Sequence, residues 1–598
     1  MKYAYLDKSN PDSIYFAYLH PDDGRALRYH FDEFMVEWIP KLAKSITENS
    51  DLSEWDEYCG NDLLQLLLEQ SLYVELIDSA RAIFRRNFAL TMGWCWDKPV
   101  YINPLLANLV RNNVNGSIAK IIKSKATLRG ISSLVRLRRF IRHRIQSTRK
   151  HEVGCKIFDK PMIGVELVEG IDPNGKNDVF WMSEEAVNPN QVILIIERQN
   201  LSLFDVEATL KYARKSGVSI VTTDAKLASE LIIPLWQPSS SLYKGALPKA
   251  PNIKKLAKNS RAWSWLSMTL QEAYYQIEFW AQLFERHNIA IYQHFTEGTP
   301  DAAIKRIAAS RAKALQIGKM RSQFFEWNAA AFHFQHQVAM VWNKDVREVL
   351  IKARTRTSHV VETGYTNDYK IDQNHKSKNM ATLNFSKSVT TVCVVYDNHP
   401  HINNHFTLND LENFYDSLLS IAKKNPSLGL LIKSKKSLII SEIKKNKLDF
   451  NLLEKQGRCI TIAGKSDSAA TIAKYADIAV GIPCSTATCE AALMGCAAFI
   501  YDPSGARRFN EKNSSGVVFR DINQFKLTLE EAVRGKIKRN NQESFCNLLI
   551  NPSNENARIK ASRFINAYLK EREYKKSSCE SLVEAIDKCS DYVYSVES

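Results

Sequence analysis

Short apolar runs alternate with amphipathic segments through the C-terminal half of the chain. The apolar runs lie at residues 388–397, 428–434, 459–464, 477–482 and 497–502. Segments with helical spacing lie between them, at residues 410–426, 468–476 and 486–495. Short runs rich in β-branched residues are typical of buried strands, and strands that alternate with helices favour a parallel sheet. This half therefore predicts a doubly wound α/β unit.

A less regular alternation fills the middle of the chain. Its expected strands lie at residues 160–168, 190–198, 218–224, 289–295 and 357–364. An amphipathic helix is expected at 205–217, where Gly217 would end it, and another begins near residue 225. The expected fold class is thus α/β, with two doubly wound, Rossmann-like domains.

These patterns divide the chain into five expected parts. They are a helical N-terminal region (1–150), a first Rossmann-like domain (151–365), a polar, aperiodic linker (366–388), a second Rossmann-like domain (389–535) and a helical tail (536–598). Open parallel sheets bind ligands beside the carboxyl ends of their strands. The sequence therefore predicts a ligand site between the two Rossmann-like domains.

The N-terminal region ends in a strongly basic segment. Eleven Lys or Arg and no acidic residue lie between Lys120 and Lys150, and apolar residues recur there at helical spacing. The segment predicts a basic amphipathic helix, which fits three roles: a solvated helix packed on the core, an anchor on an anionic inner-membrane surface, or a nucleic-acid contact. Stacking aromatic residues are scarce in the segment, so nucleic acid is the least favoured of the three.

The overall composition is that of a globular protein. Of the 598 residues, 45% are hydrophobic and 10% aromatic, and the net charge of +16 favours an anionic partner. No apolar run reaches the roughly 20 residues of a membrane-spanning helix, and residues 1–16 lack the apolar stretch of a secretory signal. The eleven cysteines include no CxxC pair, which gives no indication of a zinc or redox site. We therefore expect a cytoplasmic protein.

The segment from Tyr475 to Gly505 carries the clearest chemistry. An expected strand ends in a turn of small residues, Ser485 and Thr486 open a helix, and Glu490 follows about one turn later. The free N–H groups and positive dipole at a helix start favour a phosphate. The Ser485 and Thr486 hydroxyls would add donors, and the Glu490 carboxylate could accept ribose hydroxyls.

This segment resembles the donor-binding segment of GT-B glycosyltransferases, particularly enzymes of bacterial capsule and lipopolysaccharide biosynthesis. The resemblance is good over about residues 385–510, weak over 155–365 and absent before about 150. It implies that Ser485 and Thr486 meet the donor phosphate and that Glu490 meets the nucleotide sugar. Many retaining members carry a second glutamate eight positions earlier, where this chain has Ile482.

Other candidates for donor contacts follow neighbouring strands of the same domain. Lys433 ends one strand, and the resemblance implies a cation there, near the donor phosphate. Asn398 and His399 follow the first strand of the domain and should face the ligand site. No third ligand accompanies the nearby histidines, so we expect no metal, and no cofactor is indicated.

The first Rossmann-like domain should supply a general base for an acceptor hydroxyl. Glu169 and Asp172 lie in a glycine-bounded loop after an expected strand, with Glu166 and Asp178 nearby. His294, with Glu297 close by, ends another strand and is a further candidate.

The resemblance implies transfer of a sugar from a nucleotide-sugar donor to a surface-polysaccharide or lipid-linked acceptor. Two alternatives stay open at this point. One is a different reaction on the same fold, such as polyol-phosphate transfer or sugar-nucleotide epimerisation. The other is a non-catalytic scaffold or nucleic-acid-binding protein that uses the basic helix.

Overall fold

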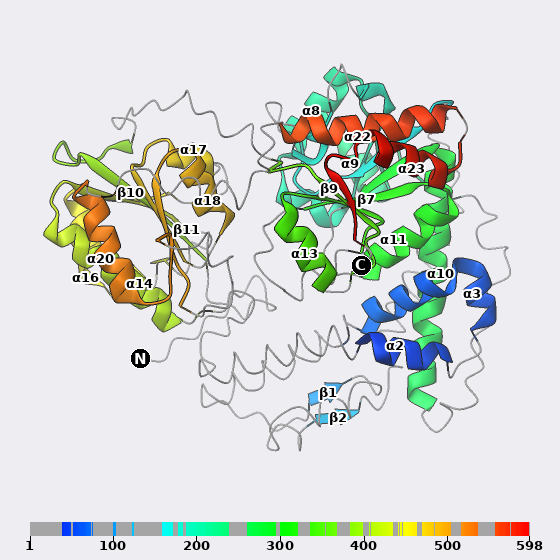
Figure 1. Ribbon diagram of the computed structural model, residues 1–598, viewed down its shortest axis with the longest axis horizontal. Helices are drawn as coiled ribbons and strands as arrows, with labels where there is room; N and C mark the ends of the chain where they lie inside the picture. The colour runs from blue at the N-terminus through cyan, green and yellow to red at the C-terminus, as the bar shows by residue number, and fades with distance from the viewer. Residues whose placement is uncertain are drawn as a thin grey trace.

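The computed structural model describes residues 39–48, 52–72, 75, 100–102, 122–124 and, with gaps, 158–596. The longest gaps after residue 158 are 239–259, 321–334, 367–382, 504–515 and 538–555. Two sheet-based α/β units make up most of this part of the chain (Figure 1). The fold class predicted from the sequence, two doubly wound domains, is confirmed.

The first unit contains an eight-stranded sheet, ordered β16-β9-β8-β7-β6-β3-β4-β5. Its strands are β3 (Met162–Glu166), β4 (Val192–Ile196), β5 (Ser219–Thr222), β6 (Ile289–His294), β7 (Leu315–Lys319), β8 (Val338–Val341), β9 (His359–Glu362) and β16 (Val593–Ser595). All neighbouring strands are parallel except β16, which pairs antiparallel with β9. After β3 the chain forms β4 and β5 on one side of β3, and it then forms β6 on the other side. A topological switch point therefore lies between β3 and β6.

The second unit contains a six-stranded parallel sheet, ordered β12-β11-β10-β13-β14-β15. Its strands are β10 (Thr391–Asp397), β11 (Leu428–Ser434), β12 (Cys459–Thr461), β13 (Ile478–Ile482), β14 (Ala497–Tyr501) and β15 (Val518–Phe519). Numbered within the unit, this is the order 3-2-1-4-5-6 of a Rossmann sheet. Its switch point lies between β10 and β13.

Helices cover both faces of the first sheet because successive strand residues point to opposite faces. In β4, Ile193 and Ile195 pack against one cluster, whereas Val192, Leu194 and Ile196 pack against another. The helices of this unit are α8 (Val206–Ser216), α9 (Ala225–Leu231), α10 (Ser260–Arg286), α11 (Pro300–Arg311) and α13 (Lys344–Lys352). The expected end of α8 is confirmed: Gly217 stands at its C-terminus with a φ of 76°.

The second sheet is covered in the same way. Its helices are α14 (Leu408–Lys424), α16 (Leu448–Lys455), α17 (Ala469–Ala473), α18 (Thr486–Leu493) and α20 (Ile522–Val533). α14, α16 and α20 pack on one face, and α17 and α18 pack on the other (Figure 1). Residues of α17 and α18 share a buried cluster with Trp342 and Tyr365 of the first unit, so apolar contacts join the two units.

The chain returns to the first unit after the second unit. α22 (Ala557–Glu573) and α23 (Ser578–Lys588) pack on the first sheet beside α8 (Figure 1). The helices of the tail are as the sequence predicts. Strand β16 was not predicted: Val593 pairs with Val361 and extends the first sheet by one strand.

The described N-terminal residues are mostly helical, as the sequence predicts. α2 (Ile39–Glu48), α3 (Ser53–Cys59) and residues 61–72 bury their apolar side chains against α10 (Figure 1). A short parallel pair, β1 (Val100–Ile102) with β2 (Ile122–Ser124), differs from that prediction. β2 corrects the start of the expected basic helix, because Ile122 favours the extended backbone. The remainder of residues 120–150 lies outside the described residues.

No helix among the described residues is both long and apolar enough to cross a membrane.

Strand β13 and helix α18 approach each other closely at Gly481. A Cβ added at Gly481 would lie 2.0 Å from Thr488 Oγ1, and Thr488 is fully buried. Replacing Gly481 with alanine should therefore destabilise the protein by about 1–3 kcal/mol, the usual cost of overpacking. Denaturant unfolding would measure the change. The double variant Gly481→Ala/Thr488→Ala should recover part of the loss, and strict additivity of the two losses would contradict the contact.

Candidate functional site

A buried ionic network lies at the carboxyl end of β3. Glu166, the last residue of β3, is 0% exposed. Its Oε2 accepts hydrogen bonds from Tyr292 Oη at 2.7 Å and Lys305 Nζ at 2.8 Å, and lies 3.3 Å from His294 Nε2. Burial by itself would raise the pKa of Glu166, but Lys305 and His294 lower it to about 2. Glu166 is therefore a charged group of the interior.

His294, a candidate base from the sequence, belongs to this network. It is the last residue of β6, is 0% exposed and stacks on Tyr292 with the ring centroids 5.9 Å apart. Burial lowers the pKa of the imidazole to about 3, although Glu166 opposes the shift, so the ring is neutral at physiological pH. A ring without exposed surface is poorly placed to meet an acceptor directly.

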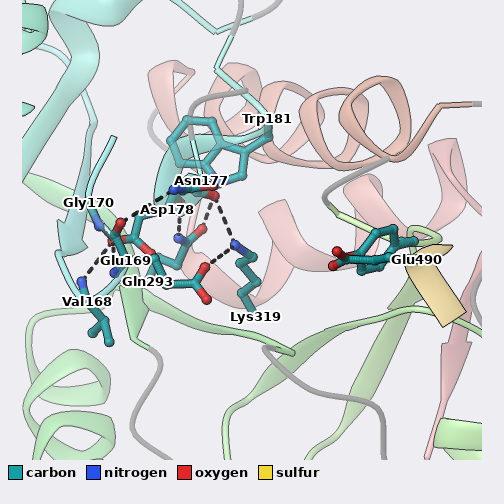
Figure 2. A network of polar contacts seen from close by, with 10 residues as sticks. Val168, Glu169, Gly170, Asn177, Asp178, Trp181, Gln293, Lys319 and Glu490 are labelled. Atoms are coloured by element: carbon teal, nitrogen blue, oxygen red, sulfur yellow. Dashed lines mark hydrogen bonds and ion pairs between the residues drawn. The ribbon is translucent and has the colours of Figure 1, made fainter. Parts of the chain in front are cut away.

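Glu169 lies at the same edge of the sheet, three residues after β3. Its Oε2 accepts from Lys319 Nζ at 3.0 Å, and Lys319 also donates to the Asn177 carbonyl at 2.9 Å (Figure 2). Lys319 ends β7 and its side chain is 1% exposed, whereas the Glu169 side chain is 25% exposed. A buried lysine thus holds a carboxylate that still reaches the surface, beside the switch point of the first sheet.

Asp178 supports the loop that carries Glu169. Its Oδ2 accepts from the backbone N–H groups of Val168, Glu169 and Gly170 at 2.8, 2.8 and 2.9 Å (Figure 2). Burial and the charge of Glu169 raise the pKa of Asp178 to about 7, although Lys319 and the backbone N–H groups act in the opposite direction. Asp178 is therefore a buried carboxyl group that can change its charge near neutral pH.

In the second unit, α18 begins where the sequence predicts. Ser485 is its N-cap residue and Thr486 its first helical residue, and both are half-buried. The Ser485 side chain accepts no capping hydrogen bond, and its Oγ lies 3.3 Å from Thr488 Oγ1. The first N–H groups of a helix have no partner within the helix, and they carry the positive end of its dipole. This helix start, close to the switch point of the second sheet, can accommodate an anion.

Glu490 joins the two units. Its Oε1 accepts a hydrogen bond from the Tyr365 hydroxyl, which follows β9 of the first unit, and its Oε2 accepts from Ala470 N of α17 at 3.2 Å. Trp342 packs edge-on against Tyr365, with the ring centroids 4.8 Å apart. Figure 2 shows Glu490 apart from the Glu169–Lys319 pair. The predicted contact of Glu490 with a donor ribose stays a prediction.

Two other predicted donor contacts lie at the carboxyl edge of the second sheet. Lys433 pairs with Tyr396 in the register of β11 and β10 and is half-buried. The Asn398 N–H donates to the Ile482 carbonyl at 3.0 Å, which bridges β10 and β13 at the switch point. No group of three potential metal ligands occurs among the described residues.

Three candidates from the sequence, Asp172, Glu297 and His399, lie outside the described residues. Of the other predicted site residues, the structure brings Glu169 and His294 to the carboxyl edge of the first sheet. It brings Ser485, Thr486, Lys433 and Asn398 to that of the second sheet.

Sequence reasoning did not find Lys319 or the role of Asp178. Lys319 ends the apolar run LQIGK, which is β7, and that strand was not predicted. A basic residue at the end of a short apolar run could have indicated a lysine at the end of a buried strand. The Asp178 side chain bonds to backbone N–H groups, and the pattern of side chains in the sequence does not predict such contacts.

Comparison with solved structures gives distant likenesses. The chain is 12% identical to UDP-GlcNAc 2-epimerase from Neisseria meningitidis bound to UDP-GlcNAc, over 70% of this chain and 100% of that one, with a TM-score of 0.41. For the S. aureus MnaA–UDP co-structure the identity is 11%, over 69% of this chain and 96% of that one, with a TM-score of 0.39. For α,α-trehalose 6-phosphate synthase from Burkholderia multivorans the identity is 9%, over 70% of this chain and 99% of that one, with a TM-score of 0.40. No curated protein matches the sequence.

A protein-family model gives the decisive match. Residues 226–527, just over half of the chain, match the family described as polysaccharide biosynthesis PFTS motif protein. The matched span contains Lys319, Lys433, Ser485 and Glu490. The predicted role in polysaccharide biosynthesis is thereby confirmed. The chain belongs to the polysaccharide biosynthesis PFTS motif family.

Proposed function

We propose that the protein is a glycosyltransferase, which moves a sugar from a nucleotide-activated donor to a surface-polysaccharide or lipid-linked acceptor. The second unit binds the donor and the first unit binds the acceptor. Glu169 is the general base that takes the proton of the acceptor hydroxyl as that oxygen attacks the anomeric carbon of the donor. The nucleotide leaves with its diphosphate or phosphate at the start of α18.

One observation carries this proposal: the partly exposed Glu169 carboxylate stands beside a switch point, held by the buried Lys319. Open α/β sheets bind ligands at such points. The ion pair holds the carboxylate in a defined direction, and its side chain is still 25% exposed. A general base needs a defined direction and a surface that the substrate can reach.

The second unit supports the donor half of the proposal. The start of α18 combines the positive end of a helix dipole with two half-buried hydroxyl groups, those of Ser485 and Thr486. Lys433 lies at the same edge of the sheet and contributes positive charge. Together these groups favour the leaving phosphate, whose negative charge grows during transfer.

Removing the two hydroxyl groups should weaken donor binding. In the variant Ser485→Ala/Thr486→Val, each lost hydrogen bond to a charged phosphate should cost about 1.5–3 kcal/mol of binding free energy. Calorimetric titration with UDP-, GDP-, CMP- and CDP-linked sugars would measure the change. Thr528→Val, on α20 of the same unit, is the control, because its hydroxyl donates to the Gln524 carbonyl. Equal donor affinity in the folded double variant and the wild type would refute the assignment.

The same donor panel tests the reaction. Release of free nucleotide that depends on both donor and acceptor, with the sugar found on the acceptor, supports glycosyl transfer. A changed sugar that stays on its nucleotide would instead mean epimerisation. Transfer of a polyol phosphate from a CDP-linked polyol would leave CMP and place the phosphate on the acceptor. Absence of any nucleotide turnover with all donors would refute an enzymatic role.

A further inference from the structure

We propose that Asp178 is a positioning residue for Glu169, and that its negative charge, in addition to its shape, sets how strongly Glu169 attracts a proton. This inference rests on the proposed role of Glu169 as the base and deepens it by identifying the group that controls the base. Asp178 itself contacts no reacting atom in this account.

The backbone around Glu169 is fixed by the Asp178 carboxylate. One oxygen, Oδ2, gathers the N–H groups of Val168, Glu169 and Gly170, so the peptide bonds on both sides of the Glu169 Cα are held. Gly170 has a φ of 75°, and a Cβ there would lie 2.7 Å from Phe204. The loop can therefore adopt this course only with glycine at that position.

Contacts with strand β6 hold the backbone of Asp178 in place. The Gln293 side chain of β6 donates to the Asp178 carbonyl at 2.6 Å, and Trp181 Nε1 donates to Gln293 Oε1 at 2.6 Å (Figure 2). Asp178 N also donates to the Gly170 carbonyl at 3.2 Å. The position of the Asp178 carboxylate is thus set by β6 on one side and by the Glu169 loop on the other.

The second carboxylate oxygen indicates a role beyond shape. Asp178 is 0% exposed, and its Oδ1 is buried without a hydrogen-bond partner. One acceptor oxygen is sufficient to accept from three N–H groups, so the course of the loop does not need the second oxygen. The unused oxygen places a titratable charge beside Glu169 and Lys319, which are the charged groups that act on Asp178.

The charges around Asp178 come from three elements. Glu169 lies on the loop after β3, Lys319 ends β7, and Arg558 of α22 donates to the Phe180 carbonyl two residues beyond Asp178. Burial and Glu169 together raise the pKa of Asp178 to about 7. Below that pH Asp178 is neutral, and the positive charge of Lys319 acts on the Glu169 carboxylate without competition from Asp178. Above it two carboxylates share one lysine, so the Glu169 anion is less stabilised and attracts a proton more strongly.

The experiment is the pH dependence of single-turnover transfer in the wild type and in Asp178→Asn. Asparagine keeps an oxygen for the three N–H groups and removes the charge. The wild-type rate should rise by about three- to tenfold through an inflection near pH 7. The variant should lose this inflection and remain near the lower plateau, with KM values within about twofold of wild type. Asp205→Asn, which removes the exposed carboxylate that caps α8, should keep the wild-type profile.

Folding of Asp178→Asn is checked by denaturant unfolding at pH 5 and pH 8. A carboxyl group with a raised pKa contributes its stability fully below about pH 4 and loses it as the pH rises through about 7. Relative to the wild type, the variant should therefore be more stable at pH 8 than at pH 5.

Two results would overturn the proposal. One is an Asp178→Asn profile that retains the wild-type inflection, which would make Asp178 a structural residue only. The other is a wild-type profile that is flat between pH 6 and pH 8, a result that needs no variant. Failure of the proposed function is distinguishable. If the protein is not a glycosyltransferase, the wild type would transfer no sugar at any pH, and if Glu169 is not the base, Glu169→Gln would keep full transfer activity.

Discussion

Replacing Glu169 with glutamine is expected to lower turnover by about 100- to 10,000-fold, the usual effect of losing a general base. Glutamine has the same length, and its carbonyl oxygen can still accept from Lys319 Nζ, now 3.0 Å from Glu169 Oε2. The loop should therefore keep its course while the side chain loses its ability to accept a proton. Nucleotide binding to the second unit should stay within about twofold of wild type.

Steady-state kinetics with a binding measurement on the same preparation would check this expectation. Glu207→Gln is the control, since Glu207 is an exposed carboxylate in the first turn of α8. Asp172→Asn should be measured beside it, because Asp172 is the other candidate in this loop. Near-normal turnover in Glu169→Gln, with a loss in Asp172→Asn, would transfer the role of base to Asp172. Near-normal turnover in both would exclude the loop.

Most of the second unit could be predicted from the sequence, although α16, α20 and β15 were not. Its strands β10, β11, β13 and β14 are short apolar runs bounded by turn residues, and α14, between β10 and β11, has a clear apolar stripe. Sequence and packing agree here because a central parallel strand is buried on both faces and must be apolar throughout. The start of α18 at Ser485 followed from the same logic.

The first unit was harder to predict. β7 and β8 are four or five residues long, and at that length an apolar run fits a strand and a buried helix equally well. β16 forms only because β9 offers an open edge more than two hundred residues earlier in the chain. The Glu169 loop was found from its glycine-bounded acidic pattern, but Lys319 depends on sheet order, which no local pattern encodes.

Replacing Lys305 with methionine is expected to destabilise the protein by about 3–5 kcal/mol at pH 8, the cost of leaving a buried charge unpaired. Lys305 and Glu166 are 1% and 0% exposed, and their Nζ and Oε2 atoms are 2.8 Å apart. Methionine retains the apolar stem but loses Nζ, which lies 4.5 Å from the centroid of the Trp280 ring. Tyr292 Oη at 2.7 Å, Asn200 Nδ2 at 3.5 Å and the neutral His294 ring would then remain close to the carboxylate, and none of them carries a positive charge.

Denaturant unfolding at two pH values would identify the cause of the loss. The pKa of Glu166 is lowered, so its contribution to stability is present above about pH 4 and is lost as the pH falls toward 2. Without Lys305, burial should raise that pKa, and the deficit of the variant should shrink between pH 8 and pH 5. The double variant Glu166→Gln/Lys305→Met should recover most of the loss, because no charge is left unpaired. A loss below about 1 kcal/mol at pH 8 would contradict this account.

The antiparallel pairing of β16 with β9 has a consequence for synthesis on the ribosome. β9 is translated before the second unit, and its partner strand, Val593–Ser595, is translated after it. During elongation the nascent first unit therefore exposes the backbone N–H and C=O groups of β9, and the apolar surface that α22 and α23 later cover. The second unit, which is continuous in sequence, can complete its sheet first. Until β16 is synthesised, the open β9 edge can therefore pair with strands of other chains. We expect the nascent chain to be prone to aggregation in this period and to benefit from a chaperone.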